Sequence, residues 1–204
     1  MKLITPKLQT FHAAVLAGGR SRRMGIDKRF LEFEGGALVD RALATARAAV
    51  NGRVMLCGSV PGYDCLPDRR ADLGPLSGIL AALEQGLTMG SANSAVLIFP
   101  VDMPLLSPLL LQCLELKARE GWPVGCQAIG FNASELPLLV KCEESVRRAV
   151  EDLLEDPDPR ARSVRKLSER LHVLRLESAA EDAELFANTN TPAEWRQIVD
   201  RVHA

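Results

Sequence analysis

The sequence predicts an α/β fold, with one Rossmann-like, doubly wound and mostly parallel sheet that carries helices on both faces. Two observations predict it. Short apolar runs alternate with longer segments of helical spacing, which is the pattern of β-α-β units. The length of 204 residues is enough for one substantial core and lies within the range of a single domain.

The first half of the chain predicts the centre of this sheet. Three apolar, β-compatible runs have the composition of buried parallel strands, at residues 13–16, 54–57 and 96–99. Three segments of helical spacing alternate with them, at residues 39–50, 76–87 and 105–120. Proline or a Gly-Pro pair precedes the last two of these segments, as expected at helix starts.

The second half is less regular. Strands are expected at residues 123–129, 136–142 and 172–176. Helices are expected at 143–155 and 160–171, separated by an Asp/Pro turn at 156–159, and a terminal helix begins near Pro192. The Asp/Pro segment is too short for a domain linker, so we expect one domain over residues 1–204.

The composition excludes several classes of protein. The formal net charge of −1 gives no general attraction to nucleic acid or to an anionic membrane. No window approaches the roughly 18 consecutive apolar residues of a membrane span, and the first residues lack the apolar core of a signal peptide. The five cysteines form no CxxC pair, and the three histidines give no zinc-ligand pattern. We therefore expect a cytoplasmic protein that binds neither nucleic acid nor membrane.

The segment LAGGRSRRMGIDK, residues 16–28, follows the first predicted strand. Gly18 and Gly19 allow backbone N–H groups to approach phosphate oxygens, because no Cβ intervenes, and Arg23 and Lys28 supply positive charge. The segment is neither a Walker A loop nor a dinucleotide-binding GxGxxG motif. It predicts a phosphate site, with an arginine-rich surface loop as the alternative.

Two aspartates extend this prediction. Asp102, in FPVDMP, follows the strand at 96–99, where a carboxylate can hold Mg²⁺ beside bound phosphates. Asp72, in RADLGPLSGI, can accept hydrogen bonds from N1–H and N2–H₂ of guanine. The alternatives are a turn or cap aspartate for the first and a solvent-facing turn residue for the second. The metal role is favoured because the strands before Gly18 and Asp102 end on one edge of the sheet.

Four segments, LAGGRSRRMGIDK, DLGPLSGI, VDMP and ANTNTPAEW, occur in an order and at a spacing that resemble the molybdenum cofactor guanylyltransferase (MobA) family. The resemblance covers residues 12–198. It implies a nucleotidyltransferase fold of the nucleotide-diphospho-sugar transferase type, with a nucleotide-binding half at about 12–110 and an acceptor-binding half at about 111–204. It also implies transfer of GMP from GTP to the phosphate of molybdopterin, with Mg²⁺ as cofactor and pyrophosphate as the second product.

The resemblance assigns roles to individual residues. The implied GTP-binding residues are Leu16, Ala17, Gly18, Gly19, Lys28, Asp72 and Asp102. Asp102 would also be the metal ligand, and the implied catalytic residues are Asp102, Lys28 and Arg23, the last facing the leaving phosphates. Asn188 and Asn190 match the NxNTP segment on the acceptor side, although by themselves they indicate only a turn and a helix cap. Cys57 departs from the family, whose members often have Asn there.

Two other functions stay open at this point. One is a nucleotidyltransferase for another base or acceptor, such as a molybdopterin cytidylyltransferase or a sugar-phosphate enzyme, although Asp72 beside GPLSG favours guanine. The other is a non-catalytic nucleotide-binding module that hands the cofactor to apoenzymes, although Lys28 and Asp102 together favour catalysis. The partners implied are GTP and molybdopterin, with other cofactor-biosynthesis proteins and recipient molybdoenzymes as candidate protein partners.

Overall fold

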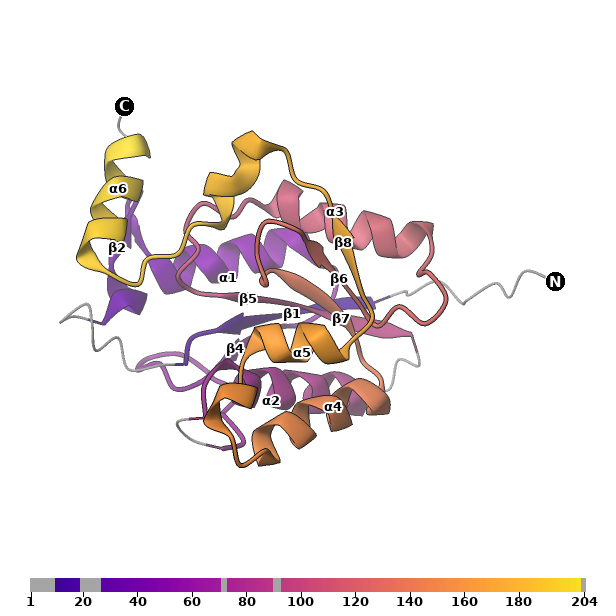
Figure 1. Cartoon of the computed structure of the whole chain (residues 1–204). Coiled ribbons are helices and arrows are strands. Elements are labelled where there is room, and N and C mark those ends of the chain that lie inside the picture. The colour runs from indigo at the N-terminus through magenta and orange to yellow at the C-terminus, as the bar shows by residue number, and fades with distance from the viewer. Residues whose placement is uncertain (1–9, 19–26, 71–72, 90–92, 203–204) are drawn as a thin grey trace.

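The computed structural model describes residues 10–18, 27–70, 73–89 and 93–202. In these ranges, six strands form one twisted sheet (Figure 1). Their spatial order is β4 (Val54–Cys57), β1 (Thr10–Leu16), β5 (Ser94–Pro100), β7 (Leu138–Lys141), β6 (Ala128–Phe131) and β8 (Val173–Leu176). Only β7 among them runs antiparallel to its neighbours. The predicted mostly parallel α/β sheet is confirmed.

Helices cover both faces of the sheet, as predicted (Figure 1). One face carries α1 (Leu38–Ala49) and α3 (Pro108–Glu120), which contact each other. The other carries α2 (Pro75–Thr88), α4 (Glu144–Glu155) and α5 (Val164–Arg170). Because both faces are covered, β1 and β5 are almost entirely apolar and buried. No helix in the described ranges is long and apolar enough to cross a bilayer.

The C-terminal helix α6 (Pro192–Val202) lies at one end of the molecule, beside a small hairpin of β2 (Glu32–Phe33) and β3 (Gly36–Ala37). The Trp195 ring packs on the Phe33 ring with centroids 5.8 Å apart. The hairpin turn has positive φ at both central residues, 49° at Glu34 and 82° at Gly35. Such a turn suits the twist of paired strands, but Glu-Gly is a weaker turn signal than Asn-Gly, and we did not predict this hairpin.

Three predicted boundaries were wrong because local capping was stronger than the apolar pattern. The strand expected from residue 123 begins at Ala128, since a turn with φ of 78° at Gly125 precedes it. The helix expected from residue 105 begins at Pro108, because the Ser107 side chain caps it by accepting a hydrogen bond from Leu110 N–H. The helix expected at 160–171 divides into a 3₁₀ turn, η2 (Pro159–Ala161), and α5, which Ser163 caps.

Candidate active site

Three strands end together at the carboxyl edge of the sheet. Leu16, the last residue of β1, lies opposite Cys57 of β4 and Pro100 of β5. The backbone continues this pairing for one more residue on each side, because Ala17 N–H donates to the Cys57 carbonyl at 2.9 Å and Val101 N–H donates to the Leu16 carbonyl at 3.0 Å. The loops that follow β1, β4 and β5 therefore leave the sheet side by side, and the shared edge of the strands before Gly18 and Asp102 is as predicted.

The loops after β1 and β4 come into close backbone contact at two glycines. Gly58 has φ of 124°, and a Cβ placed on it would lie 3.0 Å from the Gly18 nitrogen and 3.1 Å from the Ala17 carbonyl carbon. A side chain at Gly58 would therefore both strain its own backbone and press on the predicted phosphate-binding loop. Gly19 and Arg23 lie outside the described residues.

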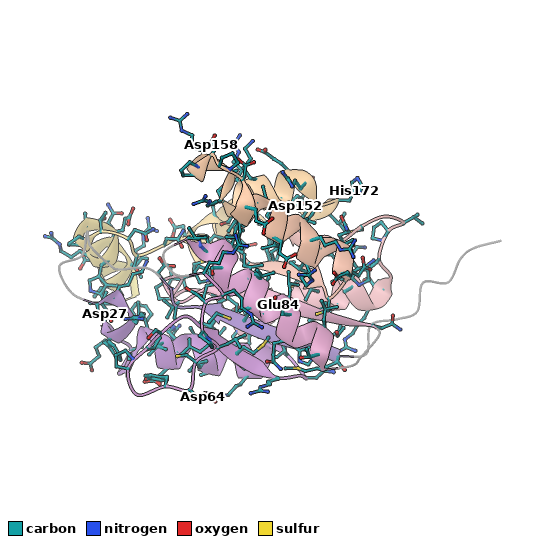
Figure 2. All side chains as sticks on the ribbon, turned by 90° about the horizontal axis from the view of Figure 1, so that it is seen from below. Asp27, Asp64, Glu84, Asp152, Asp158 and His172 are labelled. Carbon is teal, nitrogen blue, oxygen red and sulfur yellow. The ribbon has the colours of Figure 1, made fainter. Side chains whose placement is uncertain are left out.

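Lys28 and Asp102 meet at this edge. Lys28 lies in the short 3₁₀ helix η1 (Lys28–Phe30), which Asp27 caps by accepting from Arg29 N–H at 3.1 Å. Its ammonium donates to the Asp102 carboxylate, and the two side chains are only 15 % and 9 % exposed. In Figure 2, Asp27 lies at the end of the molecule that carries α6, whereas His172, which precedes β8, lies at the opposite end.

The segment before α6 completes this cluster. The Asp102 carbonyl accepts from Thr189 N–H at 2.9 Å and from the Thr189 hydroxyl at 3.3 Å, and Thr189 is fully buried. Asn190 Oδ1 accepts from the Lys28 ammonium at 3.0 Å. Asn188 is half-buried next to Thr189. The structure thus brings Gly18, Lys28, Asp102 and Asn190 to one edge of the sheet from four separate parts of the chain.

Asp68 is a residue of this edge that the sequence reasoning missed. Its carboxylate lies against two glycines: a Cβ on Gly18 would be 3.4 Å from Oδ2, and a Cβ on Gly78 would be 3.3 Å from Oδ1. The described residues offer this carboxylate no hydrogen-bond donor, and burial raises its pKa above the ordinary value. The only sequence signal was its position four residues before Asp72, which itself lies outside the described residues.

The start of α2 holds the loop that carries Asp68. Gly74 enters the helix with φ of 78°, and Pro75 follows as its first residue. The buried Ser77 hydroxyl accepts from Arg70 N–H at 2.8 Å and donates to the Arg70 carbonyl at 2.7 Å. This double hydrogen bond fixes the chain two residues after Asp68, so the carboxylate is held beside the N-terminal turn of α2.

Cys57, the last residue of β4, is only 1 % exposed. Burial, together with the neighbouring Asp68 carboxylate, raises the pKa of its thiol to about 12. The Cys57 side chain is therefore a neutral, packed group, and its backbone carbonyl supports Ala17.

Comparisons with known proteins show the family of the chain. A family model described as the MobA-like NTP transferase domain matches residues 13–175. A molybdenum cofactor guanylyltransferase of Xanthomonas euvesicatoria pv. vesicatoria is 33 % identical over 91 % of this chain and 92 % of its own length. One from Rhizobium meliloti is 32 % identical over 94 % and 92 %.

Solved structures share the fold. The molybdopterin-guanine dinucleotide biosynthesis protein A of Archaeoglobus fulgidus superposes with a TM-score of 0.72 at 20 % identity, over 94 % of this chain and 98 % of that one. The chain therefore belongs to the MobA-like NTP transferase family, among the molybdenum cofactor guanylyltransferases, and it is a nucleotidyltransferase.

Proposed function

We propose that this enzyme transfers GMP from GTP to the terminal phosphate of molybdopterin and releases pyrophosphate. The observation that carries the proposal is the meeting of Lys28, Asp102 and Asn190 at the carboxyl edge of the sheet, where β1 also ends. Ligands of open α/β sheets bind at this edge. The names of the relatives supply the identity of the base and of the acceptor.

The reaction needs positioning and charge neutralisation rather than a general base. A phosphate oxygen of the acceptor forms the new bond to the α-phosphorus of GTP, and the bond from that phosphorus to the bridging oxygen of pyrophosphate breaks. A phosphate monoester is already anionic at neutral pH, so no proton has to be removed from it. Lys28 would neutralise the phosphate oxygens as charge gathers on them, and Arg23 would face the leaving pyrophosphate.

The nucleotide would lie along the loop after β1. We propose that Leu16, Ala17, Gly18 and Gly19 contact GTP mainly through their backbone, because Leu16 and Ala17 are buried and glycines carry no side chain. Asn188 and Asn190 would line the acceptor side. Asn190 supports this assignment because it binds Lys28, so the acceptor segment and the phosphate-binding lysine are in direct contact.

A divalent cation, which we propose is Mg²⁺, fits the donors present. The described residues contain no cluster of three or more His, Cys, Asp and Glu side chains. Asp102 would thus bind the cation as a single carboxylate, which suits Mg²⁺ because that ion keeps several waters and shares substrate phosphates. When bound, it would supply positive charge that stabilises the negative charge of the phosphates. Lys28, which pairs with Asp102 in this structure, would add its own charge on the same side of the site.

The loop between β4 and α2 would recognise the base. A carboxylate can accept from both N1–H and N2–H₂ of guanine, which cytosine cannot match. We propose Asp68 for this role, because its carboxylate lies against the backbone of Gly18 and has no donor among the described residues. Asp72, which the sequence motif indicates, is kept as a further GTP contact of the same loop.

The test is a direct assay of the transfer. Purified protein is incubated with Mg²⁺, molybdopterin and either GTP or CTP, and pyrophosphate release is followed together with formation of the dinucleotide product. We expect release with GTP that depends on molybdopterin. Preference for CTP would overturn the assignment of the base, and nucleotide binding without pyrophosphate release would favour a carrier of the cofactor instead of an enzyme.

A further inference from the structure

Arg29 makes an unusual set of contacts next to the proposed nucleotide site. Its guanidinium binds both carboxylate oxygens of Asp27, with Nε donating to Oδ1 at 2.8 Å. Its Nη1 donates to two backbone carbonyls, those of Ala17, at 3.3 Å, and of Ser59. The Arg29 side chain is only 16 % exposed. One arginine therefore joins η1 to the loop after β1 and to the loop after β4.

Among the described residues, these two loops approach each other through backbone and through the Asp68 carboxylate, which lies against Gly18. They meet at Gly18 and Gly58, neither of which has a side chain that could interlock. The carbonyls of Ala17 and Ser59 lie on the two sides of this junction, and the guanidinium spans it. Arginine suits this task because its planar fork presents several N–H groups in a fixed geometry.

The contact with Ala17 also fixes an N–H group. The Ala17 carbonyl and the Gly18 N–H belong to the same planar peptide unit, in which they point in opposite directions. Holding the carbonyl against Arg29 therefore sets the direction of the Gly18 N–H. Gly18 is one of the residues proposed to contact GTP, and Lys28, which is another, precedes Arg29 directly in the chain.

We propose that Arg29 is a positioning residue for GTP binding, which aims the Gly18 N–H and holds Lys28 against the same loop. The inference rests on the proposed function. Arg29 does not itself bind phosphate in this proposal, because its charge is already paired bidentately with Asp27. Substituting Arg29 should thus weaken GTP binding although the substituted side chain never touches the nucleotide.

The test compares Arg29→Met with a matched control, Arg175→Met. Arg175 makes the same kinds of contact elsewhere: its Nη1 donates to the carbonyls of Phe131 and Ser134, both at 3.0 Å, and its Nη2 binds Glu135. The Kd for GTP is measured by calorimetry, together with the melting temperature. We expect Arg29→Met to raise the Kd at least about tenfold, since small misplacements of binding groups have effects of this size. Arg175→Met should lower the melting temperature by about as much as Arg29→Met does but leave the Kd for GTP unchanged.

Two further measurements keep the test decisive. Arg29→Lys retains the charge but cannot span both carbonyls and Asp27, so we expect an intermediate Kd. In ¹⁵N-edited spectra without ligand, the Gly18 amide should shift in both Arg29 variants and not in Arg175→Met. If wild type binds GTP and both Arg29 variants bind it equally well, the positioning role is wrong while the proposed function stands. If wild type does not bind GTP, the proposed function and this inference both fail.

Discussion

At the scale of single residues, the site depends on one buried carboxylate. Asp102 is paired with Lys28 through its side chain and with Thr189 through its backbone carbonyl. The two contacts differ in kind, because the first would give way to a cation in the proposed reaction and the second is independent of the side chain. Chemistry and folding can therefore be separated by substitution at this position.

Asp102→Asn should lower the rate of GMP transfer at least about 100-fold, since an amide is a poor ligand for Mg²⁺ and removes a negative charge from the site. The Thr189 contacts remain, so the melting temperature should stay close to that of wild type. The rate of pyrophosphate release at saturating Mg²⁺ checks the prediction. A folded variant that still makes the dinucleotide at a near-normal rate would show that Asp102 does not hold the metal.

Asp68→Asn should remove the discrimination between GTP and ITP. ITP lacks the N2 amino group, which is proposed to donate a hydrogen bond to the Asp68 carboxylate. We expect wild type to bind GTP about tenfold more tightly than ITP, which corresponds to one good hydrogen bond. Competition binding measures both affinities. Asp72→Asn is the matched control from the same loop. If Asp72→Asn instead lost the discrimination and Asp68→Asn kept it, Asp72 would be the residue that recognises guanine, as the DLGPLSGI segment indicates.

At the scale of elements, the sequence predicted the strands before the site well and the contacts between loops poorly. The strands at 13–16, 54–57 and 96–99 were predictable because a sheet covered on both faces leaves a continuous apolar run. The meeting of Lys28 and Asp102 was predictable because each belongs to a motif beside a strand end. The contacts of Asp68 and Arg29 were not, because they arise only where the loops after β1 and β4 meet in space.

The junction of these loops gives a prediction for Gly58→Ala. The new Cβ would press on Gly18 and would be strained at φ of 124°, so GTP affinity should fall at least about tenfold and stability by about 1–3 kcal/mol. Gly62→Ala is the control, because its φ of 84° is also strained but nothing lies within 4 Å of the new Cβ. It should lose stability without losing GTP affinity. Equal Kd values for the two variants would contradict the close approach at Gly58.

At the scale of the whole molecule, the two halves of the chain meet at the site. The segment that precedes α6 returns to the first half and binds Asp102 and Lys28 there, while Trp195 of α6 packs on the hairpin. The sequence predicted the NxNTP segment only as a turn and a cap, because a contact between residues 28 and 190 leaves no local pattern. Away from this edge, the chain carries a buried acid, Glu115 on α3, that has no place in the proposed reaction.

Glu115 makes the stability of the molecule depend on pH. Burial raises its pKa from 4.5 to about 7, although Arg119 at 3.6 Å favours the charged form. The folded protein thus holds this proton more tightly than the unfolded chain, so the free energy of unfolding falls as pH rises from about 4.5 to about 7. Glu115→Gln lacks this titration. The free energy of unfolding of this variant should equal that of wild type at pH 4 and exceed it by up to about 3 kcal/mol at pH 8.

Urea unfolding of both proteins at several pH values measures this difference, in which titrations common to the two cancel. Glu120→Gln, at the end of α3, is the control, because the Glu120 side chain is exposed and its ion pair with Lys117 lies at the surface. Its stability relative to wild type should change little with pH. A constant difference in the free energy of unfolding between Glu115→Gln and wild type from pH 4 to pH 8 would mean that Glu115 stays ionised inside the fold. The attraction of Arg119 would then outweigh the cost of removing the carboxylate from water.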